Sequence, residues 1–141
     1  MISGGPGPSD DRAVPLPRSA AVLAAFLGLA GAAHFAVPDF FDAMVPDVLP
    51  GGPRPWTYAS GVAELGVAAA IAAPRTRRLG GYAAAALFVA VFPANVQMAL
   101  DWSDRSPVEQ AVAYARLPLQ IPLIWWALRV ARPRPAATAA R

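Results

Sequence analysis

The sequence contains no cysteine and no lysine, and it has a single histidine among 141 residues. Without cysteine the chain cannot form a disulfide, an iron–sulfur cluster, a thiolate nucleophile or a Cys-type zinc site. One histidine argues against a haem or diiron centre, and we expect no metal site. Charged residues make up 15% of the chain, against about 25% in ordinary soluble domains, while 56% are hydrophobic. This balance predicts a membrane protein.

The motifs of soluble enzymes are also missing. The chain has no glycine-rich phosphate loop, no H-E-x-x-H and no nucleophile elbow. The net charge is +3, and the arginines gather at the ends of apolar runs. That placement indicates membrane topology and not a nucleic-acid surface. We therefore expect the lipid bilayer as a partner and no nucleic acid.

Four apolar runs are each close to the roughly 20 residues that a bilayer requires. They predict an all-α, four-transmembrane-helix antiparallel bundle within residues 19–131, with spans at about 19–37, 56–73, 79–100 and 108–130. A short interfacial helix is expected after the first span, starting at Asp39. The flanking segments 1–18 and 132–141, which are rich in Gly, Pro and Arg, are predicted to be disordered tails.

The arginines are distributed unevenly between the two sides of the predicted bundle. One side carries Arg12, Arg18, Arg75, Arg77, Arg78, Arg129, Arg132 and Arg134. By the positive-inside rule this side is cytoplasmic, and so are both termini. The first span could instead be a signal peptide, because Arg12 and Arg18 precede it and Ala30-Gly31-Ala32 resembles a cleavage site.

Each predicted span contributes at least one polar residue to the outer half of the bundle, judged from about 1.5 Å of helix per residue. An arginine at this depth costs at least about 2.5 kcal/mol unless it is paired. Glu64 is the one acidic residue inside an apolar span, so we expect it to pair with Arg116. The predicted ligand pocket consists of His34, Glu64, Asn95, Arg116 and Gln120. The same residues could equally form a dry hydrogen-bonded network that only fixes helix register.

The loop helix and the prolines bear on whether such a pocket is open. Phe40, Phe41 and Met44 would share one side of the loop helix and cover the pocket as an apolar lid. Pro93 and Pro118 lack the amide hydrogen that continues a helix, so we expect kinks that widen the bundle.

Four motifs in order resemble the DoxX-like (DoxX/DoxD superfamily) small membrane proteins. They cover roughly residues 20–130: His34-Phe35-x-x-Pro38-x-x-Phe41 with Val45-Pro46-x-x-Leu49-Pro50; Ser60-Gly61-x-x-Glu64 leading to Pro74-Arg75-Thr76-Arg77; Phe92-Pro93-Ala94-Asn95-x-x-Met98-Ala99; and Arg116-Leu117-Pro118-Leu119-Gln120. The resemblance implies a four-helix bundle in the bacterial inner membrane. It also implies redox-associated relatives, one of which is a subunit tied to thiosulfate oxidation with a quinone as acceptor. A thiol relay is not available to this chain, because it has no cysteine.

The leading functional hypothesis is therefore an accessory subunit of a redox or stress-response assembly, with an outer-half polar pocket for a small lipophilic ligand such as a quinone. Its partner would be a redox protein or a second copy of the chain. One alternative is a membrane enzyme that uses Glu64 and His34 for acid/base chemistry on a lipophilic substrate. Another is a purely structural membrane subunit. The sequence leaves open the ligand, any reaction and the oligomeric state.

Overall fold

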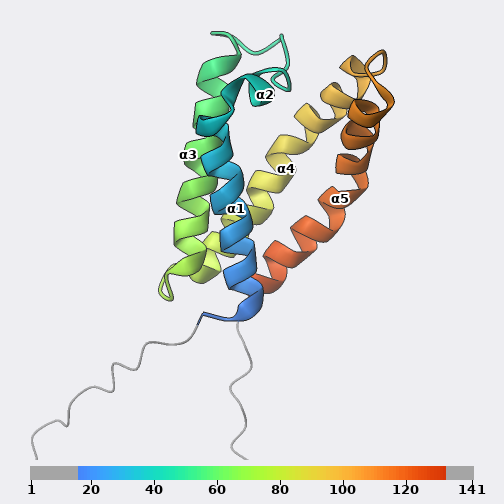
Figure 1. The fold of residues 1–141 in the computed structure, drawn as a ribbon. Helices are drawn as coiled ribbons and strands as arrows, with labels where there is room; N and C mark the ends of the chain where they lie inside the picture. Colours follow the sequence, from blue (N-terminus) through green and yellow to red (C-terminus); the bar gives the residue numbers. More distant parts are fainter. Residues whose placement is uncertain (1–15, 133–141) are drawn as a thin grey trace, which may run out of the picture.

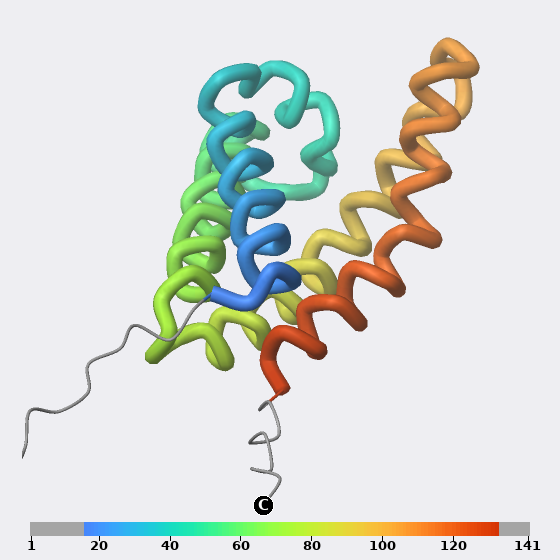
Figure 2. Tube along the Cα trace, turned by 60° about the horizontal axis from the view of Figure 1, so that its bottom comes forward, coloured from blue at the N-terminus to red at the C-terminus, as the bar shows by residue number. Residues whose placement is uncertain are grey.

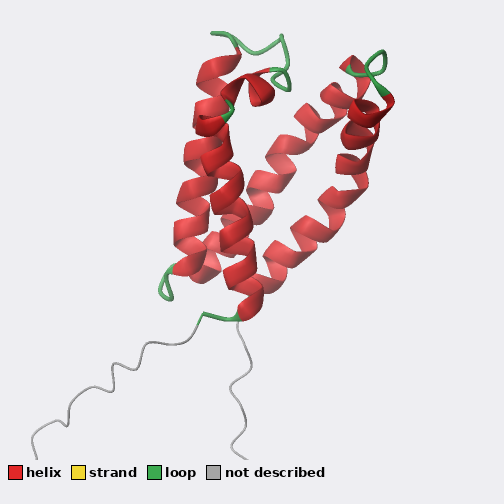
Figure 3. Cartoon of the chain, in the orientation of Figure 1, coloured by secondary structure: helices red, strands yellow, loops and turns green. Residues whose placement is uncertain are grey.

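A computed structural model describes residues 16–132 of the chain, and these residues are helical throughout with short connections (Figures 1 and 3). The element order is α1 (Arg18–Ala36), α2 (Pro38–Asp42), α3 (Pro53–Ala72), α4 (Arg77–Asp101) and α5 (Pro107–Ala131). No strand occurs in this part of the chain. The predicted all-α class is confirmed, and the four predicted spans differ from α1, α3, α4 and α5 by at most three residues at either end. The predicted tails lie outside the described residues apart from 16–18 and 132, and Arg18 already belongs to α1.

Local sequence signals explain where the helices begin and end. Gly51 and Gly52 have φ of 86° and 79°, a conformation that suits glycine, and Pro53 then starts α3. Ser106 and Glu109 form a capping box at the start of α5, with Pro107 as its first residue. Helices α4 and α5 continue through their internal prolines. Figure 1 shows α5 changing direction near its middle, where Pro118 and Pro122 lie in its sequence.

The long helices form two pairs: α1 packs along α3, and α4 packs along α5 (Figures 1 and 2). The pairs meet where α3 turns into α4 and where the described chain starts and stops. We call this end of the bundle the terminal end. At the opposite end, which carries α2 and the connections 43–52 and 102–106, the two pairs diverge in both views. We call it the loop end. The chain therefore has an open, two-armed outline in place of the regular bundle that hydropathy predicts.

Two apolar clusters correspond to these two regions. The larger one, toward the terminal end, joins all four long helices and includes Leu23, Leu27, Ile71 and Phe88. Glycines let the backbones approach there: a Cβ on Gly80 would lie 2.6 Å from the Ile71 nitrogen, and one on Gly81 would lie 2.7 Å from the Ala131 nitrogen. The smaller cluster belongs to the loop end and consists of Met98, Ala99, Trp102 and Ala113, with Met44 and Leu117 packed on it.

Within the described residues, two helices are long and apolar enough to cross a membrane. They are α1 and α4, with mean hydropathies of 1.7 and 1.8 over their best 18 residues. Helices α3 and α5 do not reach the same average, because each carries an ionisable residue in its middle (Glu64 or Arg116) and prolines besides. The structure thus supports an association with membranes through two helices, which is weaker support than four spans would give.

Candidate functional site

Helices α1 and α3 touch backbone to backbone at a pair of glycines. A Cβ on Gly31 would lie 2.9 Å from the carbonyl oxygen of Gly61, and a Cβ on Gly61 would lie 3.0 Å from that of Gly31. Such contacts exclude any larger side chain without a shift of one helix. A Cβ on Gly61 would lie 2.8 Å from Cβ of His34, and a Cβ on Gly31 would lie 3.1 Å from Cβ of Glu64, so both side chains leave their helices beside this crossing.

His34 and Glu64 form the polar pair of this arm. The Nδ1 atom of His34 lies 2.8 Å from the carbonyl oxygen of Ala30 and 3.6 Å from Oε2 of Glu64. Since a carbonyl oxygen only accepts hydrogen bonds, Nδ1 carries the proton, and Nε2 of the neutral ring is an acceptor. The Phe41 ring stacks on the imidazole with centroids 3.7 Å apart. The buried Oε2 atom of Glu64 has no hydrogen-bond partner among the described residues.

Asn95, Arg116 and Gln120 form the polar group of the other arm. Asn95 on α4 donates from Nδ2 to Oε1 of Gln120 at 3.3 Å and accepts from Nε of Arg116 at 3.2 Å. Gln120 in turn donates to the carbonyl oxygen of Phe88. Asn95 and Gln120 are 6% and 5% exposed, so this network replaces water for groups that would otherwise be buried without partners. It ties α4 to α5 at the height where both helices contain prolines.

The predicted pairing of Glu64 with Arg116 is wrong as a direct contact. Among the ion pairs of the described residues, the partner of Glu64 is His34, and Arg116 bonds to Asn95 instead. The physical reason is the separation of the two helix pairs toward the loop end, which places Glu64 and Arg116 on different arms. Their opposite charges still attract each other across the space between the arms.

The segment around α2 connects the two arms. Phe41 covers His34 on one arm, while Sδ of Met44 accepts from Nη1 of Arg116 at 3.6 Å on the other. Phe40 meets the ring of Phe41 edge-on, at 5.4 Å between centroids, and is itself 51% exposed. Of the three residues predicted to form a lid, Phe41 and Met44 contact the polar residues, whereas Phe40 contacts Phe41 and is otherwise exposed.

A charged network that sequence reasoning missed holds α2 in this position. Asp42 accepts from Oγ1 of Thr57 at 2.6 Å and from Nε of Arg54 at 2.8 Å, and Arg54 also pairs with Asp39. The Thr57 hydroxyl, more than Arg54, holds the pKa of the Asp42 carboxyl below its ordinary value. The available signal was the pair Asp39 and Asp42, which are three residues apart and share one face of the short helix, followed by the arginine Arg54 before the next span.

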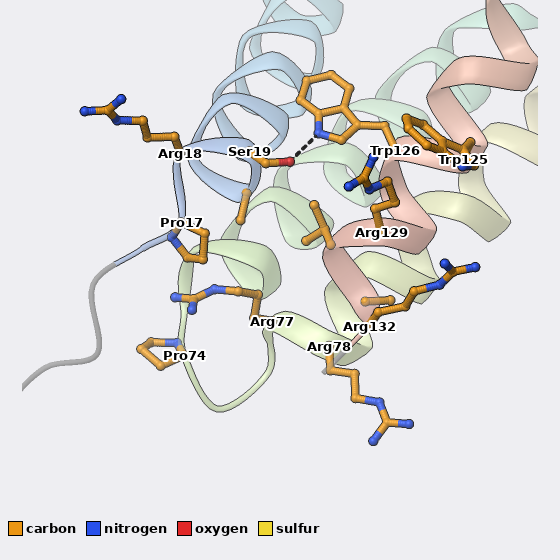
Figure 4. A pocket seen from close by; sticks show the side chains of 13 residues that line it. Pro17, Arg18, Ser19, Pro74, Arg77, Arg78, Trp125, Trp126, Arg129 and Arg132 are labelled. Carbon is orange, nitrogen blue, oxygen red and sulfur yellow. Dashed lines mark hydrogen bonds between the residues drawn. The ribbon is translucent and has the colours of Figure 1, made fainter. Parts of the chain in front are cut away.

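Two pockets among the described residues open at the two ends of the bundle. A pocket of about 390 Å³ at the loop end is lined by residues of α2, of the α4–α5 connection and of the start of α5, among them Phe40, Trp102, Arg105 and Glu109. A larger one of about 850 Å³ opens at the terminal end (Figure 4). None of the five predicted pocket residues lines either of them. Within the described residues, no three His, Cys, Asp or Glu side chains come together as a metal site would require.

These features define a class: an all-helical protein whose outward faces are apolar and whose buried polar side chains form one group within each helix pair. A family model described as a domain of unknown function (DUF8561) matches residues 23–131. This match covers α3, α4 and α5 in full and α1 from residue 23 onward, and the chain belongs to that family. Comparison with curated proteins and with solved structures gave no match.

Proposed function

We propose that the chain is a multi-pass membrane protein of DoxX-like type that crosses the bacterial inner membrane four times. Large apolar side chains on the outward faces of all four long helices support this, including Val22, Leu29, Val62, Leu79, Val89, Leu119 and Ile121, each more than half exposed. Exposed apolar surface on this scale is unfavourable in water and expected against lipid. The internal polar residues Glu64 and Arg116 lower the average hydropathy of α3 and α5 without occupying those outward faces.

The orientation follows from the charges at the two ends. Five arginines line the pocket at the terminal end, whereas the loop-end arginines Arg54 and Arg105 are paired with carboxylates. The positive-inside rule then puts the terminal end and both chain termini in the cytoplasm. Reporter fusions within 43–52 and 102–106 should report an extracytoplasmic location. A cytoplasmic signal from either connection would contradict the topology.

The proposed activity is the binding of a small lipophilic ligand of the quinone class between the two arms, beneath α2. The observation that carries it is the buried Oε2 atom of Glu64. This atom lies 3.6 Å from Nδ1 of His34 and has no hydrogen-bond partner among the described residues. A buried polar atom of this kind costs free energy unless it serves a function or meets a partner. Polar groups at membrane depth are functional-site candidates for the same reason.

The chemistry of the two arms suits opposite ends of such a ligand. On one arm, Nε2 of His34 can accept a hydrogen bond from a quinol hydroxyl, and the Glu64 carboxylate beside Nδ1 would stabilise the imidazolium if the proton is transferred. On the other arm, the Arg116 guanidinium has five N–H groups, of which two meet Asn95 and Met44. Its remaining donors suit a quinone carbonyl. The protein would act as an accessory subunit, and a redox protein or a second copy would be its partner.

The self-contained hydrogen bonding of Asn95 and Gln120 favours a second candidate, a structural membrane subunit in which the polar groups only fix helix packing. A titration of the full chain in mild detergent with a short-chain benzoquinone and its quinol separates the two. We expect binding by the wild type and about tenfold weaker binding by Arg116→Gln, the loss of one charge-assisted hydrogen bond.

Arg105→Gln is the matched control, since it removes the same charge at the surface beside Trp102. It should bind as the wild type does. Absence of binding by the wild type would favour the structural subunit, and equal losses in both variants would contradict the assigned site. Conversion of the added ligand by proton transfer alone, without a change of its oxidation state, would instead favour a membrane enzyme with His34 and Glu64 as acid and base.

A further inference from the structure

The pocket at the terminal end, of about 850 Å³, is strongly basic. It is formed by the start of α1, the α3–α4 turn and the last turns of α5 (Figure 4). Its lining includes five arginines and, among the described residues, no acidic side chain: Arg18, Arg77, Arg78, Arg129 and Arg132. With the residues that the structure describes, none of the five forms an ion pair, whereas both arginines of the loop end do. The positive charge of this pocket is therefore not neutralised by the side chains that the structure describes around it.

Aromatic residues shape the wall of the pocket that α5 supplies. Trp126 donates from Nε1 to Oγ of Ser19 at 2.8 Å, which fixes α5 against the first turn of α1. Trp125 is 55% exposed, and the Arg129 guanidinium lies 4.6 Å from the centre of its ring. Stacking on an indole orients a guanidinium without occupying its N–H groups. Figure 4 shows both tryptophans above Arg77, Arg78, Arg129 and Arg132, while Arg18 points away to the left.

One of the arginines has a role in the fold itself. Arg77 donates to the carbonyl oxygens of Ile71 and Ala72, and Thr76 donates to that of Ala70, so together they cap the C-terminal end of α3. The Arg78 guanidinium lies 5.9 Å from the Tyr82 ring, and Arg129 stacks on Trp125. Neither Arg78 nor Arg129 donates a hydrogen bond to another described residue, so their N–H groups remain available to a ligand.

We infer that this pocket binds the headgroup of an anionic phospholipid, with the acyl chains lying along the apolar faces of α1 and α5. Arginine forks match phosphate oxygens in geometry and charge. Tryptophan side chains prefer the boundary between headgroups and hydrocarbon, and basic pockets between membrane helices on the cytoplasmic side suit such headgroups. The adjoining apolar surface, with Ile121 at 74% and Trp125 at 55% exposure, suits a lipid tail and not a nucleic-acid backbone.

The inference relies on the membrane insertion proposed above but not on the quinone site, which lies at the other end of the bundle. Its test uses the full chain in mild non-ionic detergent, with phosphatidylglycerol or zwitterionic phosphatidylcholine added. Lipid retained on the protein is measured by native mass spectrometry, and stabilisation by the shift in melting temperature. We expect phosphatidylglycerol to be retained and to raise the melting temperature, and phosphatidylcholine to do neither.

The discriminating variants are Arg129→Gln and Arg105→Gln. Both remove an arginine that stacks on a tryptophan, at 4.6 Å and 4.5 Å respectively, but at opposite ends of α5. Arg129→Gln should weaken retention of phosphatidylglycerol about tenfold, and Arg105→Gln should leave it unchanged. If Arg129→Gln fails to fold, Arg78→Gln at the same pocket should show the same loss.

Three results would overturn the inference. Equal retention of the two lipids would show that the headgroup charge is not recognised. Equal loss in the variants at the two ends would show a general charge effect. Binding of soluble glycerophosphoglycerol as tight as that of the intact lipid would identify a site for a free phosphate ester. A cytoplasmic signal from the loop-end reporter fusions, in contrast, would contradict the proposed membrane topology. The comparison of phosphatidylglycerol with phosphatidylcholine would still test the headgroup site.

Discussion

The close crossing of α1 and α3 can be tested with two glycines of the same helix. Gly61 and Gly66 both lie inside α3, and both become alanine in the proposed variants. A Cβ on Gly61 would lie 2.8 Å from Cβ of His34 and 3.0 Å from the carbonyl oxygen of Gly31. A Cβ on Gly66 would meet nothing within 4 Å. The two substitutions therefore share their chemistry and differ in packing.

The change in helix propensity is the same in both variants, so the difference between their free energies of unfolding reports the packing at each site. Replacing a helical glycine by alanine gains about 0.8–1 kcal/mol. At Gly66 this gain should appear as a small stabilisation. At Gly61 overpacking against backbone costs typically about 1–3 kcal/mol, which offsets or exceeds the gain. The free energy of unfolding of Gly61→Ala should thus be lower than that of Gly66→Ala by about 1–3 kcal/mol.

Equilibrium unfolding of the purified chain in detergent, followed by circular dichroism, measures this difference. Gly31→Ala should behave like Gly61→Ala, because its Cβ would lie 2.9 Å from the Gly61 carbonyl oxygen. If Gly61→Ala were as stable as Gly66→Ala, the backbone contact would not exist in solution. The reasoning that places His34 beside Glu64 would then lose its structural basis.

Two further predictions concern polar contacts. Asn95→Ala should lower the free energy of unfolding by about 1–3 kcal/mol, because it leaves Oε1 of buried Gln120 without its hydrogen-bond donor. Gln97→Ala, at an exposed site on the same helix, should change the free energy of unfolding by less than about 0.5 kcal/mol. Equal effects of the two substitutions would contradict the buried network. The pKa of Asp42 is lowered by Thr57, so its contribution to stability is complete above the ordinary value of 3.8 and is lost as the pH falls through the lower folded-state pKa. Melting temperatures of wild type and Asp42→Asn should therefore differ at neutral pH and converge below about pH 4, and a difference that persists into strong acid would refute this.

The helices were predictable because hydropathy and proline positions define them locally. Pro38, Pro53 and Pro107 each stand at the first position of a helix, and the apolar runs between such signals gave the bounds of the long helices closely. Position along a helix axis also followed from residue counts, which is why the five polar residues were placed at similar heights.

The sequence did not predict which way each side chain points around its helix axis, nor the angle between the two helix pairs. Estimated depth gave Glu64 and Arg116 the same height, but it contains no information on which arm each side chain faces. On α1 the small residues Ala24, Gly28 and Ala32 recur every four positions, a pattern typical of close helix packing, yet the tightest contact uses Gly31, and Ala32 is exposed. Gly31 and the residues Ala24, Gly28 and Ala32 all have small side chains, so the sequence alone does not show which of them faces α3.

The glycine contacts at the terminal end have a mechanical consequence. Gly80 and Gly81 lie in the first turns of α4, which ends at Asp101, so about 20 residues of helix extend from them toward the loop end, a length of about 30 Å. A rotation of about five degrees at these glycines would displace the far end of α4 by about 3 Å. That displacement is comparable to the 3.6 Å between Met44 and Arg116 that connects the arms. A small rotation of α4 about its glycine contacts is thus amplified along the length of the helix. The resulting displacement at the loop end would be large enough to separate Met44 from Arg116.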